Sequence, residues 1–302
     1  MDARRRPRHK PHTLPYEFIM PQIAIVRTVA NLRAQVAAWK GAGERVALVP
    51  TMGALHEGHL SLVALARTKA ERVVASVFVN PTQFGPNEDF DAYPRGEGRD
   101  ADLLAGAGCD LLFAPTVAEM YPPGFSTTIT VTGVSEPLDG AARPGHFAGV
   151  ATIVAKLLLQ CGPDVAVFGE KDYQQLQVIK RLVRDLDIPV EIVGAPTSRL
   201  EDGLARSSRN AYLTAAERKV AGRMNLALAD AVRRLQAGES VERVEATGLA
   251  ALERAGFQRI DYFEVRNADD LSHPGPGPLT VPARILAAAM IGKTRLIDNM
   301  AV

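Results

Sequence analysis

Short apolar runs separated by helical stretches constrain the fold of this chain more than any other feature. Five runs are rich in Val, Ala, Leu or Ile, over residues 45–49, 72–79, 110–114, 165–168 and 189–193. Between them, apolar residues recur at helical spacing over residues 60–70, 101–107, 149–160 and 173–185. Continuous apolar strands that alternate with helices are typical of a parallel sheet covered on both faces. The sequence therefore predicts an α/β fold with a doubly wound parallel sheet.

The sequence pattern changes after residue 198. Four elements are expected beyond it: Ala-rich helices over residues 215–236 and 241–255, and strands near residues 260–265 and 284–291. The segment 273–278 (HPGPGP) cannot continue a helix or a strand, so we expect an exposed loop there. We therefore predict one domain over residues 23–197 and a smaller α+β C-terminal domain over residues 198–302.

The charge balance and the cysteines narrow the function and the compartment. The chain has 302 residues, and its 35 Lys and Arg against 34 Asp and Glu give no global charge that would indicate nucleic acid or a membrane as partner. No apolar run has the length of a membrane span. Cys109 and Cys161 lie far apart in apolar stretches, which indicates buried thiols in a reducing cytoplasm rather than a disulfide or a metal site.

The first ten residues are rich in Arg, and no apolar core of a signal peptide follows them. A short basic run can touch nucleic acid, but it is more often simply solvated. We therefore predict a basic, disordered tail over residues 1–22 and no nucleic-acid partner.

The segment His56-Glu57-Gly58-His59 joins the first apolar run to the helix that follows it. Two histidines three positions apart at a helix start share one face of that helix. The free N–H groups and the dipole of a helix N-terminus favour phosphate, and Gly58 allows the backbone to approach a ligand closely. Imidazole donors there would stabilise the charge that grows on a departing pyrophosphate, and His59 could protonate it. The alternatives are two surface histidines or a pair of metal ligands.

A second polar segment, residues 169–175 (GEKDYQQ), follows the apolar run at 165–168 and opens a helix. Open parallel sheets bind ligands at the carboxyl ends of their strands. Lys171 is therefore placed to meet phosphate, and Asp172 to hold a ribose hydroxyl or Mg²⁺. A Lys–Asp ion pair on the surface is the alternative.

A third polar segment, residues 203–210 (GLARSSRN), sets two hydroxyls between two guanidinium groups just past the predicted boundary. Such a loop could close over phosphates from the second domain, although loops rich in Ser and Arg are common and often merely exposed. Gln83 and Gln175 offer uncharged amides for hydroxyl and carboxylate oxygens, with an ordinary surface role as the alternative for each. Together, the three segments favour a phosphate-binding site.

Five segments of the chain form one recognisable set: PTMGALHEGHL (50–60), FVNPTQFGPNEDFDAYPR (78–95), RPGHFAGV (143–150), FGEKDYQQL (168–176) and SSRNAYL (207–213). The set resembles the pantothenate synthetases, which are pantoate–β-alanine ligases of the HxGH nucleotidylyltransferase superfamily. The resemblance runs from about residue 26 to the end, where RLIDNM (295–300) also fits. It implies a homodimeric cytoplasmic enzyme with a Rossmann-like ATP domain and a smaller, lid-like C-terminal domain.

The resemblance also implies a reaction in two steps, which belongs to coenzyme A biosynthesis. The pantoate carboxylate attacks the α-phosphate of ATP to give pantoyl adenylate and pyrophosphate, and the amine of β-alanine then displaces AMP. Mg²⁺ would neutralise the phosphates. Exclusion of water would protect the mixed anhydride between the steps.

The resemblance assigns roles residue by residue. The implied catalytic residues are His59 as general acid, His56 and Lys171. The implied ATP-binding residues are Met52, His56, His59, Gly169, Lys171, Asp172, Ser198, Arg206, Ser207, Ser208 and Arg209. The implied residues of the pantoate and β-alanine pocket are Gln83, Gln175, Asn80, Tyr93 and Arg143. The metal ligands stay unknown, since the resemblance identifies none and Asp172 has a ribose hydroxyl as its alternative partner.

One position departs from the family pattern, because Arg206 stands where the family usually has Met or Leu. Arg206 could add a phosphate contact, or its apolar stem could replace Met while the charge reaches solvent, which we favour. Two rival functions are weighed against the ligase. One is a nucleotidylyltransferase of the same superfamily with a different acceptor. The other is a nucleic-acid-binding protein that uses the basic tail, against which the neutral net charge argues.

Overall fold

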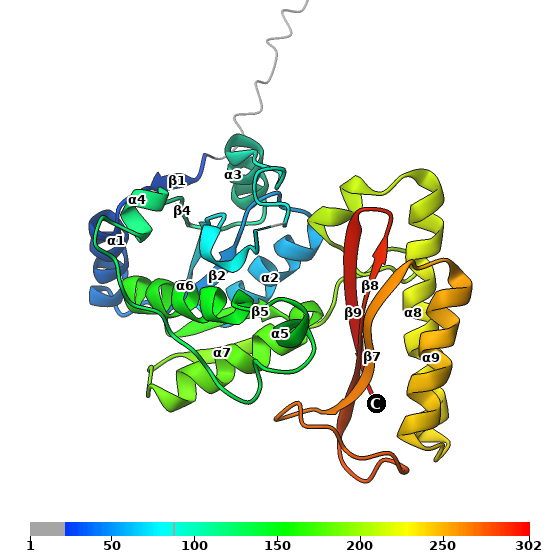
Figure 1. Ribbon diagram of the computed structural model, residues 1–302. Coiled ribbons are helices and arrows are strands. Elements are labelled where there is room, and N and C mark those ends of the chain that lie inside the picture. The colour runs from blue at the N-terminus through cyan, green and yellow to red at the C-terminus, as the bar shows by residue number, and fades with distance from the viewer. Residues whose placement is uncertain (1–21, 87) are drawn as a thin grey trace, which may run out of the picture.

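The computed structural model of the protein describes residues 22–86 and 88–302. The predicted tail at residues 1–22 lies outside the described residues except for its last position. Two units stand side by side in Figure 1: a parallel sheet wrapped by helices, and a smaller antiparallel sheet backed by two long helices. No helix in the described part of the chain is long and apolar enough to cross a membrane.

Six parallel strands form the main sheet, in the spatial order β1-β4-β3-β2-β5-β6. The strands are β1 (Ala24–Val26), β2 (Val46–Thr51), β3 (Arg72–Val77), β4 (Leu111–Phe113), β5 (Val165–Gly169) and β6 (Glu191–Ala195). Successive residues of a strand point to opposite faces, and both sets are buried: Leu48 and Val74 on one face, Val49 and Ala75 on the other. This double burial explains why the strands read as continuous apolar runs.

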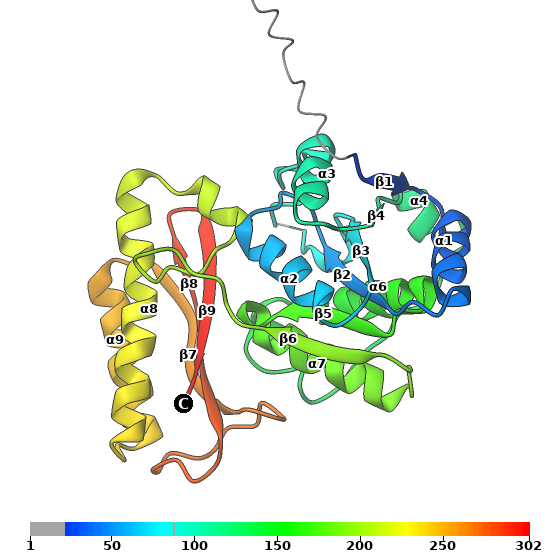
Figure 2. The same ribbon diagram turned by 180° about the vertical axis from the view of Figure 1, so that it is seen from behind.

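Helices cover both faces of the main sheet, so the predicted doubly wound α/β fold is confirmed (Figures 1 and 2). One face carries α1 (Val29–Gly41), α6 (His146–Cys161) and α7 (Tyr173–Asp185). The other carries α2 (Glu57–Arg67) and α3 (Glu97–Gly106). The remaining short helices of this unit are η1 (Pro81–Gln83), α4 (Val117–Met120), α5 (Asp139–Ala142) and η2 (Glu170–Asp172).

The C-terminal unit is an antiparallel sheet of order β7-β8-β9. Its elements are η3 (Ser208–Tyr212), α8 (Ala215–Gln236), α9 (Val241–Ala255), β7 (Arg259–Asn267), β8 (Ala283–Ile291) and β9 (Thr294–Ala301). The two long helices pack on one face of this sheet (Figure 2). The opposite face contributes Tyr262, Leu286 and Ala288 to the core of the first unit. A domain boundary at residue 198, in the segment between β6 and η3, remains our proposal.

Proline stands inside the central strand β2, where a ladder donor is normally required. Pro50 lies opposite Ser76 of β3 and has no N–H to offer. The hydroxyl of Thr51 donates to the carbonyl oxygen of Ser76 at 2.7 Å and supplies a hydrogen bond there. The strand can therefore end in Pro-Thr-Met-Gly and turn directly toward α2.

Candidate active site

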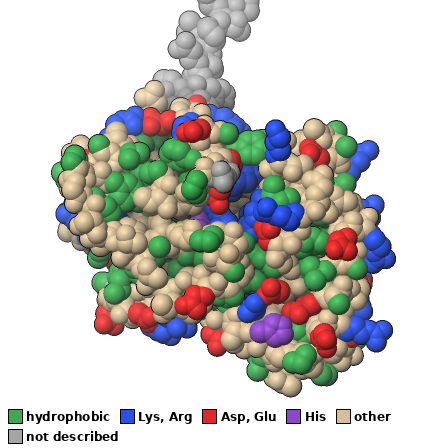
Figure 3. Space-filling model, in the orientation of Figure 1, with side chains coloured by type: hydrophobic (Ala, Val, Ile, Leu, Met, Phe, Trp, Pro, Cys, Tyr) green, Lys and Arg blue, Asp and Glu red, His purple; other side chains and the backbone are tan. Residues whose placement is uncertain are grey.

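A cavity of about 1140 Å³ lies between the main sheet and the C-terminal unit. In the space-filling view of Figure 3, Lys and Arg side chains gather at the junction of the two units. Every residue predicted from the sequence to belong to the site lines this cavity: Met52, His56, His59, Asn80, Gln83, Tyr93, Arg143, Gly169, Lys171, Asp172, Gln175, Ser198, Arg206, Ser207, Ser208 and Arg209. The structure thus brings segments from both units to one place.

The two histidines of the HxGH motif cap the start of α2. Nδ1 of His56 accepts the N–H of Gly58 at 3.1 Å, and Nδ1 of His59 accepts the N–H of His56 at 3.3 Å. A neutral imidazole whose Nδ1 accepts carries its proton on Nε2. The ring centroids lie 4.1 Å apart, so two Nε2–H donors stand together at the helix N-terminus. This arrangement suits the oxygens of a phosphate chain.

Both rings are neutral near pH 7 when no anion is bound. Burial, helped by the positive charge of Lys171, lowers the pKa of His56 to about 4, and burial, helped by the neighbouring His56 ring and Lys171, lowers that of His59 to about 3. Neutral imidazoles can donate hydrogen bonds without carrying charge. Proton transfer from His59 would need a bound anion to raise its pKa first. The geometry therefore supports hydrogen-bond donation directly, and the general-acid role of His59 remains a prediction.

The turn before α2 is held from both sides. Gly53 has φ of 85° and Ala54 has φ of 51°, which is the left-handed region that costs energy for a residue with a Cβ. Asp100 on α3 is 1% exposed and accepts the N–H groups of Ala54 at 2.9 Å and Leu55 at 2.8 Å. The hydroxyl of Ser208 donates to the carbonyl oxygen of Ala54 at 3.1 Å. The loop of Ser207, Ser208 and Arg209 (the Ser-Ser-Arg loop) is therefore hydrogen-bonded to the turn at Gly53 and Ala54 that leads into the HxGH motif (the HxGH turn).

The second predicted segment follows β5 in the turn η2. Nζ of Lys171 lies 3.7 Å from a carboxylate oxygen of Asp172, so the ion pair considered as an alternative is present. Asn299 on β9 donates to the carbonyl oxygens of Glu170 at 2.9 Å and Lys171 at 2.8 Å. The C-terminal unit thereby fixes the backbone that carries Lys171 into the cavity. Gly169 begins this turn at the strand's carboxyl end.

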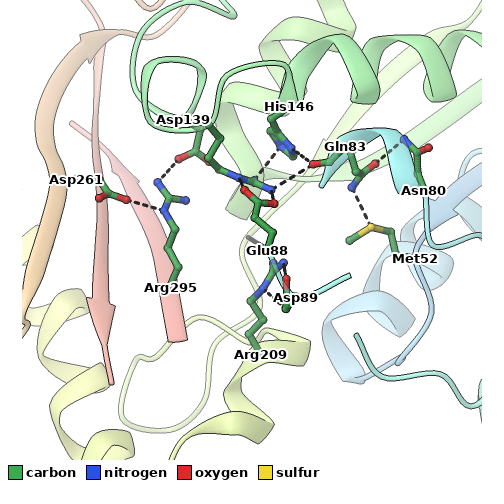
Figure 4. Close-up of polar contacts among 11 residues, drawn as sticks. Met52, Asn80, Gln83, Glu88, Asp89, Asp139, His146, Arg209, Asp261 and Arg295 are labelled. Atoms are coloured by element: carbon green, nitrogen blue, oxygen red, sulfur yellow. Dashed lines mark hydrogen bonds and ion pairs between the residues drawn. The ribbon is translucent and has the colours of Figure 1, made fainter. Parts of the chain in front are cut away.

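The amide of Gln83 sits in a small hydrogen-bonded network beside Met52 (Figure 4). Its Oε1 accepts from Asn80 Nδ2 at 3.1 Å, and its Nε2 donates to Sδ of Met52 at 2.9 Å. Asn80 is 1% exposed, and its Oδ1 accepts from the hydroxyl of Tyr121 at 2.7 Å. Asn80 therefore holds the side-chain amide of Gln83 in place. Gln175, in the first turn of α7, faces the same cavity.

Two arginines of the cavity are held by consecutive acidic residues of one loop, and Figure 4 labels Glu88, Asp89 and Arg209 of this set. Arg143 donates to both carboxylate oxygens of Glu88, at 2.7 and 2.6 Å. Arg209 donates to both oxygens of Asp89, at 3.0 and 2.7 Å. The guanidinium of Arg209 also lies 5.9 Å from the ring centroid of Tyr93. These two of the cations predicted to line the site are thus paired inside the protein.

The family model described as pantoate-beta-alanine ligase matches residues 24–301, nearly the whole chain. The chain belongs to the pantoate–β-alanine ligase family. The pantothenate synthetase of Caulobacter vibrioides is 66% identical over 279 residues, which cover 92% of this chain and 98% of that protein. The pantothenate synthetase of Paramagnetospirillum magneticum is 62% identical over 281 residues, covering 93% and 98%.

Solved structures of the family share the fold. The crystal structure of pantothenate synthetase from Thermus thermophilus has a TM-score of 0.86 and 49% identity, covering 92% of this chain and 99% of that one. The pantoate-beta-alanine ligase of Francisella tularensis, described as complexed with beta-gamma ATP and beta-alanine, has a TM-score of 0.74 and 33% identity, covering 92% and 97%. The recognition made from the five sequence segments is therefore confirmed.

Arg206, the departure from the family pattern, is ion-paired with a residue of the HxGH motif. One guanidinium nitrogen lies 2.5 Å from a carboxylate oxygen of Glu57. The Arg206 side chain is 28% exposed and that of Glu57 is 71% exposed. The guanidinium of Arg206 is therefore paired with a carboxylate, and it is neither alone in solvent nor free to bind phosphate. The pair adds a second link between the Ser-Ser-Arg loop and α2.

Two residues that support the site in this ligase family member were not identified from the sequence. Asp100 holds the HxGH turn from a helix far along the chain, and no local pattern marks it. His146 is different, because it stands in the RPGHFAGV segment three positions after Arg143. The signal that could have identified His146 was its position as a polar residue in a segment already assigned to the site.

Proposed function

We propose that this chain condenses pantoate with β-alanine to form pantothenate and converts ATP to AMP and pyrophosphate. The observation that carries the proposal is the family match over residues 24–301, together with a cavity that gathers every site residue expected for that reaction. The Francisella tularensis relative, whose description names beta-gamma ATP and beta-alanine, supports two of the three substrates. The alternative nucleotidylyltransferase with another acceptor is not favoured.

In the first step, a carboxylate oxygen of pantoate forms a bond to the α-phosphorus of ATP, and the bond from that phosphorus to the bridging oxygen of pyrophosphate breaks. Negative charge grows on the departing pyrophosphate. The Nε2–H groups of His56 and His59 and the ammonium of Lys171 provide donors for that charge. Gln83 and Gln175 would orient pantoate through neutral amides, which do not compete for the phosphates.

In the second step, the amine of β-alanine attacks the carbonyl carbon of pantoyl adenylate. The acyl C–O bond breaks, and that oxygen leaves with AMP. The ammonium proton is lost to solvent as the amide forms. Closure of the cavity by the loops that carry Ser208 and Asp89 would keep water from hydrolysing the mixed anhydride.

We propose that Mg²⁺ enters with ATP rather than as a resident ion. Within residues 22–86 and 88–302, no cluster of three or more His, Cys, Asp or Glu side chains is arranged to hold a metal ion. Mg²⁺ commonly binds through one or two carboxylates together with substrate phosphates. Asp172, which is about half exposed beside Lys171, fits such a single contact, and a ribose hydroxyl is its alternative partner.

We also propose a homodimer in the cytoplasm, on the resemblance to the family. Sedimentation at micromolar concentration tests the assembly, with an expected mass twice that of the 32.4 kDa chain. A species of single-chain mass would contradict the dimer and leave the catalytic proposal intact.

The activity is tested by incubating purified protein with ATP, Mg²⁺, pantoate and β-alanine, and with mixtures that lack one component each. We expect pantothenate and AMP in equal amounts, both requiring pantoate and β-alanine. Formation of ADP in place of AMP, or a product that retains the nucleotide, would contradict the proposal.

A further inference from the structure

His146 is the first residue of α6 and lies between two groups of the proposed pantoate pocket (Figure 4). It follows Gly145, whose left-handed backbone (φ of 84°) turns the chain into the helix. On one side of its ring lies the main chain of Gln83, and on the other lies the guanidinium of Arg143. These two residues come from segments about sixty positions apart in the sequence, and the His146 ring is their common contact.

The partners of the ring fix which nitrogen carries the proton. A guanidinium has only donors, so Arg143 Nη1 donates to Nε2 of His146, at 3.1 Å. Nδ1 then carries the proton and donates to the carbonyl oxygen of Gln83 at 2.8 Å. The only acceptor nitrogen of the neutral ring is thus occupied by Arg143. A role as a general base would require breaking that contact.

The charges around the ring favour this neutral state. Burial lowers the pKa of His146 to about 4, and the positive charge of Arg143 contributes to the lowering. The carboxylates of Asp139 and Glu88 oppose it, and so does the hydrogen bond to Gln83. A protonated ring would lose its acceptor and place a second cation against the guanidinium. The contacts to Gln83 and Arg143 therefore persist at neutral pH.

The two residues depend on His146 to different degrees. Arg143 is also held by two short hydrogen bonds to Glu88. Within residues 22–86 and 88–302, the carbonyl of Gln83 accepts one further side-chain hydrogen bond, at 3.5 Å from the same Arg143. Loss of the Nδ1 donor should therefore disturb Gln83 more than loss of the Nε2 acceptor disturbs Arg143.

We propose that His146 is a positioning residue for pantoate, which holds the backbone of Gln83 and the guanidinium of Arg143 at a fixed separation across the substrate pocket. The inference rests on the proposed function, because it takes Gln83 as a pantoate contact. His146 itself does not act on the reacting atoms. Its contribution is therefore expected in the binding of pantoate and not in the binding of ATP, because both of its partners, Gln83 and Arg143, are assigned to the pantoate pocket.

Three substitutions separate the two hydrogen bonds. In His146→Asn, the side-chain amide nitrogen can take the place of Nδ1–H and keep the bond to Gln83. In His146→Gln, the longer amide can reach the place of Nε2 and accept from Arg143, but the donor to Gln83 is lost. His146→Ala removes both. His273→Asn is the matched control, since His273 is a half-exposed histidine that contacts Glu245 in the C-terminal unit.

Steady-state kinetics with each substrate varied in turn gives the test. We expect KM for pantoate to rise about tenfold in His146→Ala and His146→Gln, which is the loss of one net hydrogen bond. His146→Asn should recover most of that loss, while KM for ATP stays within about twofold in all variants. Equal defects in Asn and Ala variants, or equal changes in the two KM values, would overturn the proposal.

Two controls keep the outcome clear. Thermal unfolding of each variant shows whether it is folded, and the comparison of Asn with Gln decides the question if the Ala variant is not. The unmodified chain is run in the same assay. Pantothenate formation with unchanged pantoate KM in every variant would overturn only the role of His146. No pantothenate from the unmodified chain would overturn the proposed function, and this inference with it.

Discussion

Substitution of Gly149 by Ala would move the loop that carries Gln83 without changing any side chain assigned to substrate binding. Gly149 lies in the first turn of α6, directly against η1. A Cβ there would stand 2.3 Å from the carbonyl oxygen of Thr82 and 2.8 Å from Cα of Gln83. These contacts are with backbone atoms, so no side-chain rotation can relieve them.

The size of the effect follows from the overlap. Ordinary contacts of a Cβ begin at 3.4 Å, so η1 and α6 must separate by about 1 Å. A misplacement of about 1 Å in a positioning group can cost about a hundredfold in rate. We therefore expect kcat/KM for pantoate to fall about a hundredfold. The free energy of unfolding should fall by about 1–3 kcal/mol from overpacking, less about 1 kcal/mol returned by the higher helix propensity of Ala.

The assay is AMP release with pantoate varied at saturating ATP, and then with ATP varied at saturating pantoate. Gly98→Ala is the matched control, because Gly98 is also inside a helix and an added Cβ would meet nothing within 4 Å. That control should keep its activity and gain slightly in stability. A folded Gly149→Ala variant whose kcat/KM for pantoate stays within about threefold of the parent would refute the reasoning.

Three further predictions concern the histidines of the site and Arg206. His59→Ala should lower kcat by about 10²–10³-fold. The free energy of unfolding should fall by only about 1 kcal/mol, because one helix-cap hydrogen bond is lost. Undiminished turnover would exclude His59 from the chemistry. Arg206→Met should change kcat/KM for ATP by less than about tenfold, because the ion pair of Arg206 with Glu57 is partly exposed and such pairs contribute about 0–1 kcal/mol. A larger loss would mean that Arg206 binds phosphate. Because the pKa values of His56, His59 and His146 are lowered to about 4, 3 and 4, the unfolded chain binds more protons below their usual pKa of 6.5. The urea midpoint should therefore fall as pH drops from about 6.5 to about 4, less steeply in His146→Asn, and a flat profile would contradict these values.

The fold could be predicted where burial leaves a strong pattern. The central strands are apolar on both faces, so their runs were visible without any alignment. β1 was missed because it is three residues long and partly exposed on the sheet edge. α1 and β9 were also missed, and β9 alternates buried and half-buried residues without a clear apolar run. The predicted start of α2 came three residues late, because His56 caps the helix with its own ring.

The site was predictable only as a set of residues. Histidine spacing and strand ends indicated which side chains would meet at one edge of the sheet. Some partners of those side chains come from distant segments, and no local pattern encodes them. Arg209 with Asp89 is one example, since these residues are separated by 120 positions. Pairings of this kind decide whether a cation is free to bind substrate, and only the structure shows them.

The most direct test of the central claim follows the oxygen atoms of pantoate. Pantoate labelled with ¹⁸O in its carboxylate is converted in the presence of ATP, Mg²⁺ and β-alanine, and the AMP is analysed by mass spectrometry. If the carboxylate attacks the α-phosphate and its oxygen leaves with AMP, each AMP molecule must carry one ¹⁸O atom. AMP without the label, or label found in orthophosphate or pyrophosphate, would contradict an adenylate formed at the HxGH site.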